Sequence, residues 1–206
     1  LVMINDALTF LVAQLNEYLR SKMGVSGLVV QKRLVKGDGN EVTGETKVIC
    51  QLVNIEEERI GKAQVPVASP VGSQFPTRNP ELRVNLSVLF TAICPQDTQD
   101  LLGDEEEYVT SIKMLSYVIQ YFQYRHVFTT ENSPSLPPTI GNLIVELYPI
   151  SLENQNYLWA SLGAKYRPSV VYKARLITIY EDTFTDIVGV PRIVDTNPVI
   201  YPENRS

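Results

Sequence analysis

The chain has 206 residues, of which 44% are hydrophobic and 20% charged, and its formal net charge is −5. A chain of this length can bury a core without a disulfide or metal, and its mild acidity argues against a general nucleic-acid or membrane-surface binder. Its longest strongly apolar stretch, 86–94, is far shorter than the ~20 residues of a membrane-spanning helix. The first residues lack the positive region of a signal peptide, so we expect folding in the cytosol.

The opening segment predicts an amphipathic helix. Asn5 or Asp6 can serve as its N-cap, and Gly24 and Gly27 are placed to end it. The apolar positions between these signals recur every three or four residues, which places them on one face of a helix. They are Leu8, Leu11, Val12, Leu15 and Leu19.

Extended segments follow this helix. Residues 25–35 and 46–55 are joined through the glycine-containing turn 36–40, which predicts a hairpin. Residues 61–80 carry four prolines without a helical period, and this pattern is typical of a long loop. Apolar side chains alternate with mostly polar ones from 82 to 90, which predicts a strand with one face on a core, in the centre of the sheet.

A second long helix is predicted from Asp104, a candidate N-cap whose next three residues are acidic and suit the positive end of the helix dipole. We expect its core stripe to consist of Tyr108, Ile112, Leu115, Ile119 and Phe122.

The remaining segments predict a strand at 143–147, a short helix opened by Ser151 and closed by Gly163, and a strand at 169–181. Because strands and helices do not alternate regularly, we expect an α+β fold. It is a mostly antiparallel sheet of about five strands, with two long helices on one face and one short helix packed on it. Residues 1–181 form this domain, and 182–206 form an extended C-terminal arm that contains a possible strand at 187–194.

Candidate chemical groups are few. His126 is the only histidine and follows a helix end, where a capping or surface role is the expectation. Cys50 and Cys94 lie in apolar segments that favour core packing over redox or ligand roles, and Trp159 is expected in the core. The acidic runs at 56–58 and 104–107 could be read as catalytic carboxylates or a Ca²⁺ site, but their spacing favours solvated faces.

The segment 158–176 reads LWASLGAKYRPSVVYKARL. This segment resembles one found in the cap, or tail-terminator, proteins of extracellular contractile injection systems of the antifeeding-prophage and virulence-cassette type. Further matching segments are 4–8, 52–59, 79–80, 85–90 and 115–123. The segments follow in order and cover the chain from Ile4 to about Tyr180, but they leave out residues 61–76 and the arm after Asp182.

The resemblance implies a structural assembly protein that forms a hexameric ring at the distal end of an injection particle. Its partners would be the inner tube and sheath subunits, whose growth the ring ends while it holds the last sheath layer extended. Such a protein needs no cofactor, metal, nucleic acid, membrane or small-molecule substrate and is not an enzyme. It would assemble in the bacterial cytoplasm and then form part of the particle, which is extracellular or cell-associated.

Residues expected at subunit contacts lie in the stretch from Lys165 to Arg175, in the C-terminal arm and at 78–79. The basic and aromatic run from Lys165 could in principle bind nucleic acid, but the acidic chain favours a protein partner. A small adaptor for cargo or for a partner of the same particle remains an alternative function, as does a hydrolase with an unrecognised site. The candidate interface residues are Arg78, Asn79, Lys165, Tyr166, Arg167, Lys173, Arg175, Ile187, Val188 and Val190.

Overall fold

Six strands form one mixed sheet with the order β1-β2-β3-β6-β5-β4. The computed structural model describes residues 2–42, 47–58, 83–93 and 103–178. Every neighbouring pair of strands is antiparallel except β1 and β2, which are parallel. The strands are β1 (Val29–Gln31), β2 (Lys47–Glu57), β3 (Arg83–Ile93), β4 (Val127–Thr129), β5 (Ile140–Leu147) and β6 (Ser169–Thr178).

The strand expected in the centre of the sheet is β3, and this prediction is confirmed because β3 pairs with both β2 and β6. Side chains on alternate residues point to opposite faces of a strand. Val84, Leu86, Val88 and Phe90 accordingly lie in one hydrophobic cluster, whereas Leu89 belongs to a second cluster on the other face. The strand is therefore buried on both faces along part of its length.

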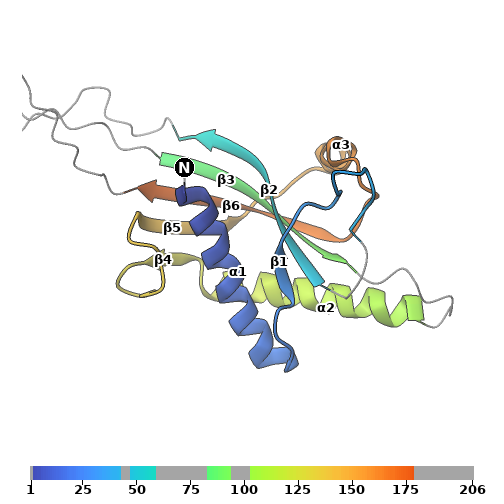
Figure 1. Ribbon diagram of the computed structural model, residues 1–206, viewed down its shortest axis with the longest axis horizontal. Coiled ribbons are helices and arrows are strands. Elements are labelled where there is room, and N and C mark those ends of the chain that lie inside the picture. The colour runs from blue at the N-terminus through green and yellow to red at the C-terminus, as the bar shows by residue number, and fades with distance from the viewer. Residues whose placement is uncertain (1, 43–46, 59–82, 94–102, 179–206) are drawn as a thin grey trace, which may run out of the picture. The chain divides into compact units, whose positions relative to one another are not determined.

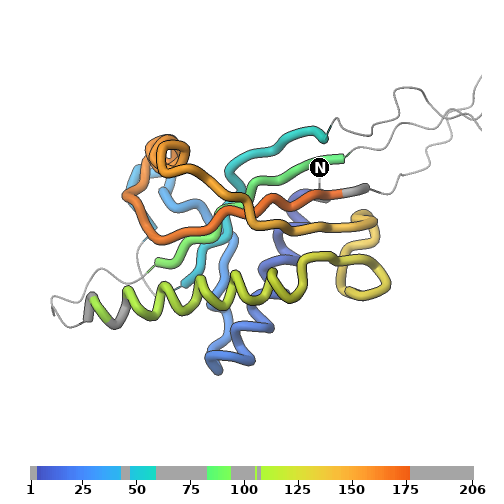
Figure 2. The backbone as a smooth tube through the Cα atoms, turned by 180° about the vertical axis from the view of Figure 1, so that it is seen from behind, coloured from blue at the N-terminus to red at the C-terminus, as the bar shows by residue number. Residues whose placement is uncertain are grey.

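Two long helices cover one face of the sheet and the short helix covers part of the other (Figures 1 and 2). Side chains of α1 (Val2–Met23) and α2 (Gly103–Tyr124) contribute to the larger hydrophobic cluster, and Trp159 of α3 (Leu152–Leu162) to the smaller one. This arrangement confirms the predicted α+β class, the mostly antiparallel sheet and the two long helices on one face.

The predicted hairpin between 25–35 and 46–55 is wrong. The first of these segments forms the short strand β1, which runs parallel to β2 with Val29 opposite Val48. The turn at 36–40 instead closes a small loop, bridged between Val35 and Glu41, on the way from β1 to β2. A turn signal fixes where a chain reverses but does not name the strand with which the next segment pairs.

The predicted starts of the two long helices are also wrong. The first helix begins at Val2, so Asn5 and Asp6 lie inside it, and α2 begins at Gly103, one residue before Asp104. The predicted end of the first helix is confirmed, because Gly24 takes a φ of 72° and donates its N–H to the Arg20 carbonyl at 2.9 Å.

The predicted core stripe of α2 is correct only in part. Tyr108, Ile112 and Ile119 are exposed by 58%, 38% and 37%, whereas Leu115 and Phe122 are buried as expected. The face that meets the sheet is a neighbouring stripe, and it also has helical spacing. Its further members are Met114, Val118 and Tyr121.

Candidate functional site

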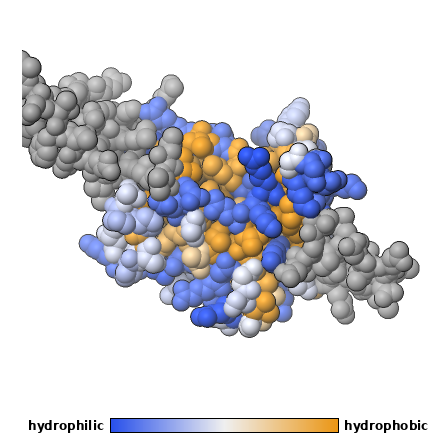
Figure 3. Space-filling model, viewed as in Figure 1, coloured by the Kyte–Doolittle hydropathy of each residue, from blue (hydrophilic) through white to orange (hydrophobic). Residues whose placement is uncertain are grey.

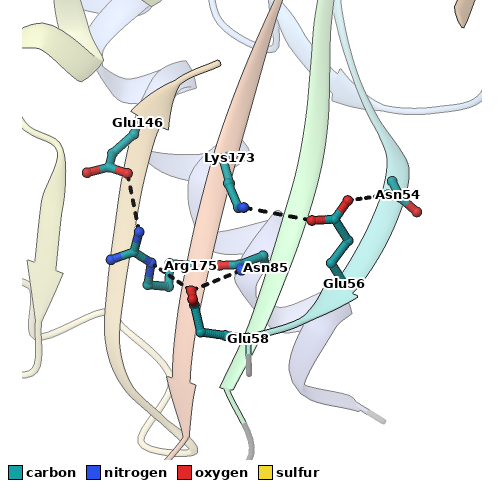
Figure 4. Close-up of polar contacts among 7 residues, drawn as sticks. All are labelled: Asn54, Glu56, Glu58, Asn85, Glu146, Lys173 and Arg175. Atoms are coloured by element: carbon teal, nitrogen blue, oxygen red, sulfur yellow. Dashed lines mark hydrogen bonds and ion pairs between the residues drawn. The ribbon is translucent and has the colours of Figure 1, made fainter. Parts of the chain in front are cut away.

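A charged surface lies on the face of the sheet that α1 and α2 leave uncovered. Lys173 and Arg175 project from β6 on alternate residues, and the register places them beside Ser87 and Asn85 of β3. Glu56 of β2 and Glu146 of β5 belong to the strands on either side. Side chains from four adjacent strands are thus brought onto one face (Figure 4).

Ion pairs join these side chains across the strands (Figure 4). Lys173 Nζ lies 3.7 Å from Glu56 Oε2. Arg175 bridges two carboxylates, because its Nε is 3.3 Å from Glu58 Oε2 and its Nη2 is 3.6 Å from Glu146 Oε2. Three carboxylates face two cations in this cluster, so its net charge is negative by one unit. Figure 4 draws these side chains together with two amides. We call the whole set the charged face, and its members are Asn54, Glu56, Glu58, Asn85, Glu146, Lys173 and Arg175.

Two amides complete the charged face. Asn54 donates to Glu56 Oε1 at 2.9 Å, and Asn85 donates to Glu58 Oε2 at 3.0 Å. Asn85 is only 4% exposed, and its Oδ1 accepts no hydrogen bond from the described residues. Asn85 and Glu58 form the least exposed part of the charged face, and Glu56 and Glu146 stay open to water.

A groove separates the charged face from α3. The segment after β5 crosses the sheet here, held by a 2.9 Å hydrogen bond from the Tyr148 N–H to the Val171 carbonyl. Its lining combines apolar and polar side chains from the sheet, from the segment after β5 and from α3. The apolar lining consists of Val53, Tyr148, Pro149, Ile150, Leu158 and Val171, and the polar lining consists of Asn54, Glu56, Ser87, Asn154 and Lys173.

The short helix α3 is closed at both ends as the sequence predicts. Ser151 is its N-cap and accepts the Asn154 N–H at 3.2 Å, and Gly163 ends it in the left-handed region with φ 67°. Trp159 packs in the smaller hydrophobic cluster. Its ring lies edge-on to that of Tyr166, with 5.8 Å between the two ring centroids. The predicted core position of Trp159 is therefore confirmed.

Glu41 ties the segment after β1 to the connection between α3 and β6. Its carboxylate accepts the Lys165 backbone N–H at 2.7 Å and Arg167 Nη2 at 2.7 Å. The side chains of Arg167 and Glu41 are 12% and 21% exposed. The Lys165 N–H and, less strongly, the Arg167 guanidinium hold the pKa of Glu41 below its usual value.

Replacing Glu41 with glutamine should lower the free energy of unfolding by about 1 kcal/mol, because a charge-assisted pair becomes a neutral contact. A carboxyl whose pKa is lowered by folding adds stability above its unfolded pKa and loses it as the pH falls through its folded pKa. The difference between wild type and Glu41→Gln should therefore shrink as the pH is lowered below about 4.5. Urea unfolding at pH 7 and pH 3 checks this, and an equal difference at both pH values would contradict it.

The candidate interface residues that the structure describes lie in two places. Lys173 and Arg175 lie on the charged face, whereas Lys165, Tyr166 and Arg167 precede β6 beside α3 and the Glu41 contact. Arg78, Asn79, Ile187, Val188 and Val190 lie outside the described residues.

Sequence reasoning missed five members of the charged face, which are Asn54, Glu56, Glu58, Asn85 and Glu146. Glu58 belongs to the acidic run at 56–58, which was expected to be solvated, but its side chain is only 17% exposed. The alternation of Glu56 with Glu58 and of Lys173 with Arg175 is a signal in the sequence. That these pairs meet depends on the order of the strands, which the pattern of one strand does not contain.

The surroundings of the described cysteine and of the histidine do not favour catalysis or metal binding. Burial raises the pKa of the Cys50 thiol to about 12, which suits a packing role rather than a nucleophile. His126 is exposed after α2, and its carbonyl accepts the Val145 N–H. Within the described ranges, no cluster of three or more His, Cys, Asp or Glu side chains could hold a metal ion. The described helices include none long and apolar enough to cross a membrane.

Comparisons with known proteins agree with this fold. The chain is similar to the solved structure of the anti-feeding prophage cap, described as a tube-terminating cap, with 16% identity and a TM-score of 0.54 over 96% of this chain. It covers 61% of that cap chain. A second solved structure, the PVC sheath/tube terminator in the extended state, matches at 17% identity and a TM-score of 0.41, over 92% of this chain and 65% of that one.

The curated proteins contain no match. The family model described as the Pvc16 N-terminal domain matches residues 6–190. This range includes β1 to β6 and nearly all of α1, together with α2 and α3. The resemblance to cap proteins that the sequence suggested is thereby confirmed, and the chain belongs to the Pvc16 N-terminal domain family.

Proposed function

We propose that this chain is a structural subunit of a cap that ends the inner tube and sheath of a contractile injection particle. One observation supports this most strongly: nearly the whole chain shares the fold of a protein described as a tube-terminating cap. The family model, which spans residues 6–190, supports the same assignment. The chain spans 61% of that solved cap chain, so the proposal concerns the part of a cap that this domain builds.

The cap acts through shape and not through bond chemistry. Six copies form a closed ring, as the resemblance to cap proteins implies. A closed cyclic assembly satisfies each subunit's contacts with its neighbours and leaves no site at which the ring can grow further. One side of the ring fits the last layer of the tube and sheath, and the other offers no place for another subunit. The ring holds the last sheath layer extended, and its partners are therefore other protein subunits.

The proposed ring contacts involve both places described above, the charged face with Lys173 and Arg175 and the segment from Lys165 to Arg167. Residues 182–206, which lie outside the described residues, are proposed as an arm that reaches the sheath. Assembly takes place in the bacterial cytoplasm, and the cap then stays with the particle.

Electron microscopy of this protein mixed with purified tube and sheath subunits tests the proposal. We expect rings in the protein alone at high concentration, and density of the same diameter at one end of each tube. A stable monomer that never decorates tube ends would contradict the capping role. Binding to the subunits without ring formation would instead support the adaptor function.

A further inference from the structure

The N-terminal half of α2 keeps apolar side chains exposed. Tyr108, Val109 and Ile112 are exposed by 58%, 63% and 38%, and Ile119 further along the helix by 37%. The large hydrophobic side chains that α2 buries in the core all come after Lys113. Figure 1 shows the reason, because the N-terminal half of α2 extends past the ends of β3 and β6.

A groove runs between these side chains and the start of β6. Tyr108, Ile112 and Ile119 line it on the helix side, and Tyr166 and Val170 line it on the other. None of the described residues in its lining is charged. We call this feature the α2 groove.

The wall of the α2 groove opposite the helix is held in place within the subunit. The Thr91 hydroxyl donates to the Pro168 carbonyl at 3.0 Å, and the Tyr166 ring packs edge-on against that of Trp159. The Glu41 contacts described above fix the residues on either side of Tyr166. A groove that is already formed loses little conformational entropy when a partner binds.

The exposed area around the α2 groove matches the needs of a subunit contact. Figure 3 shows hydrophobic residues at the surface in several separate places among hydrophilic ones, which is normal for a soluble protein. The side chains around the α2 groove are instead adjacent and, with Tyr166 at 64% exposure, present on the order of 500 Å² of apolar surface. One partner contributes about 800 Å² to a standard interface, of which about 60% is apolar. The groove thus has the apolar area that one side of such a contact needs.

The other end of α2 carries an exposed aromatic side chain. Tyr124 is the last residue of the helix and is 87% exposed, the highest value among large hydrophobic side chains in the described ranges. At 1.5 Å per residue, Tyr108 and Tyr124 are separated by roughly 24 Å along the helix. One helix therefore places an apolar groove near its start and an aromatic side chain at its end. A contact between two different surfaces of the same chain repeats head to tail and can close into a ring.

We propose that the α2 groove binds a second copy of this chain, whose Tyr124 fills it. This contact rests on the proposed function, because it assigns the surfaces through which one subunit of the ring meets the next. Each subunit then uses its groove once and its Tyr124 once, which leaves neither surface unpaired in a closed ring. Since Tyr166 lines the groove, the contact continues the segment from Lys165 to Arg167 proposed above. The uncharged lining also suits a permanent contact between copies, whose interfaces are more apolar than those of transient partners.

Two substitutions that block one surface each test this pairing. Ile112→Glu places a carboxylate in the α2 groove, and Tyr124→Glu places one at the end of the helix. Each should raise the concentration at which the isolated chain forms rings by more than tenfold in analytical ultracentrifugation. Mixed in equal amounts, the two variants should form a dimer and nothing larger. The reason is that the Tyr124→Glu chain keeps an intact groove, whereas the Ile112→Glu chain keeps an intact Tyr124.

Matched controls carry the same kinds of change outside both surfaces. Val25→Glu alters a valine that is 51% exposed after α1, and Tyr157→Glu alters a tyrosine that is 67% exposed on α3. Both should form rings as wild type does. Circular dichroism should show that every variant is folded, and Tyr124→Glu should be as stable as wild type at concentrations too low for rings. Tyr108→Glu repeats the groove test at a more exposed position if Ile112→Glu does not fold.

The outcomes separate this contact from the capping role. Rings formed by both blocked variants would overturn the pairing and leave the capping role in place. Loss of rings in both variants without a dimer in the mixture would also overturn it, because the two surfaces would then not meet. If wild type stays monomeric and Ile112→Glu loses only its binding to tube or sheath subunits, the groove binds that partner and the second copy is wrong. A wild-type chain that neither self-associates nor binds tube ends would contradict both proposals.

Discussion

Replacing Phe90 with alanine should lower the free energy of unfolding by about 3 to 5 kcal/mol, which is the range for truncating a fully buried aromatic side chain. Phe90 is 0% exposed on the central strand β3. Its ring lies 5.7 Å from that of Phe122 on α2 and 5.9 Å from that of Tyr172 on β6. Its loss therefore opens a cavity where the sheet meets a long helix, and the cost is a large fraction of the roughly 5 to 15 kcal/mol by which native domains are stable.

Urea unfolding followed by circular dichroism and by the fluorescence of the single Trp159 measures this effect. The two signals should give the same midpoint if helices, sheet and the smaller cluster unfold together. Tyr124→Ala is the matched control, because Tyr124 is 87% exposed at the end of α2, and it should change stability by less than about 0.5 kcal/mol. Equal effects of the two substitutions would contradict the placement of the core.

Replacing Trp159 with alanine should cost about 3 to 5 kcal/mol as well, because the indole fills the smaller hydrophobic cluster between α3 and the sheet. It is 4% exposed, and its Nε1 makes no hydrogen bond with the described residues. Trp159→Phe removes this buried donor and keeps an aromatic ring, so it should cost clearly less than Trp159→Ala.

Circular dichroism must follow these variants, since the fluorescent residue is the one replaced. Tyr157, which is 67% exposed on the same helix, supplies the control, and Tyr157→Ala should leave the urea midpoint nearly unchanged. A loss for Trp159→Phe as large as that for Trp159→Ala would contradict this prediction, because phenylalanine keeps an aromatic ring in the cluster and leaves a smaller cavity than alanine does.

Local signals in the sequence predicted those features that depend on a few neighbouring residues. The short helix is one example, because Ser151 and Gly163 have the hydrogen bonds and the backbone angle that their residue types favour. The central strand is another, since alternation alone places Phe90 toward a core. Both features were located correctly without knowledge of the rest of the fold.

Features that depend on distant segments were not predictable in the same way. The predicted antiparallel pairing of β1 with β2 was wrong, because a three-residue strand has the same apolar pattern whether its neighbour is parallel or antiparallel. The predicted core stripe of α2 was wrong in part because the helix has two neighbouring apolar stripes, one with Ile112 and one with Val118. Which of them is buried depends on how the helix packs on the sheet, and Val118 is the buried one. The charged face required the register that brings Glu58 beside Arg175, although the sequence already marked Arg175 as a candidate contact.

The most direct test of the capping role is an electron-microscopic image of particles assembled without this protein, scored for length and sheath state. We expect tubes and sheaths of irregular length, with last sheath layers that contract or detach, and restoration of uniform extended particles when the protein is supplied again. Particles of normal length with a fully extended sheath in its absence would contradict the account.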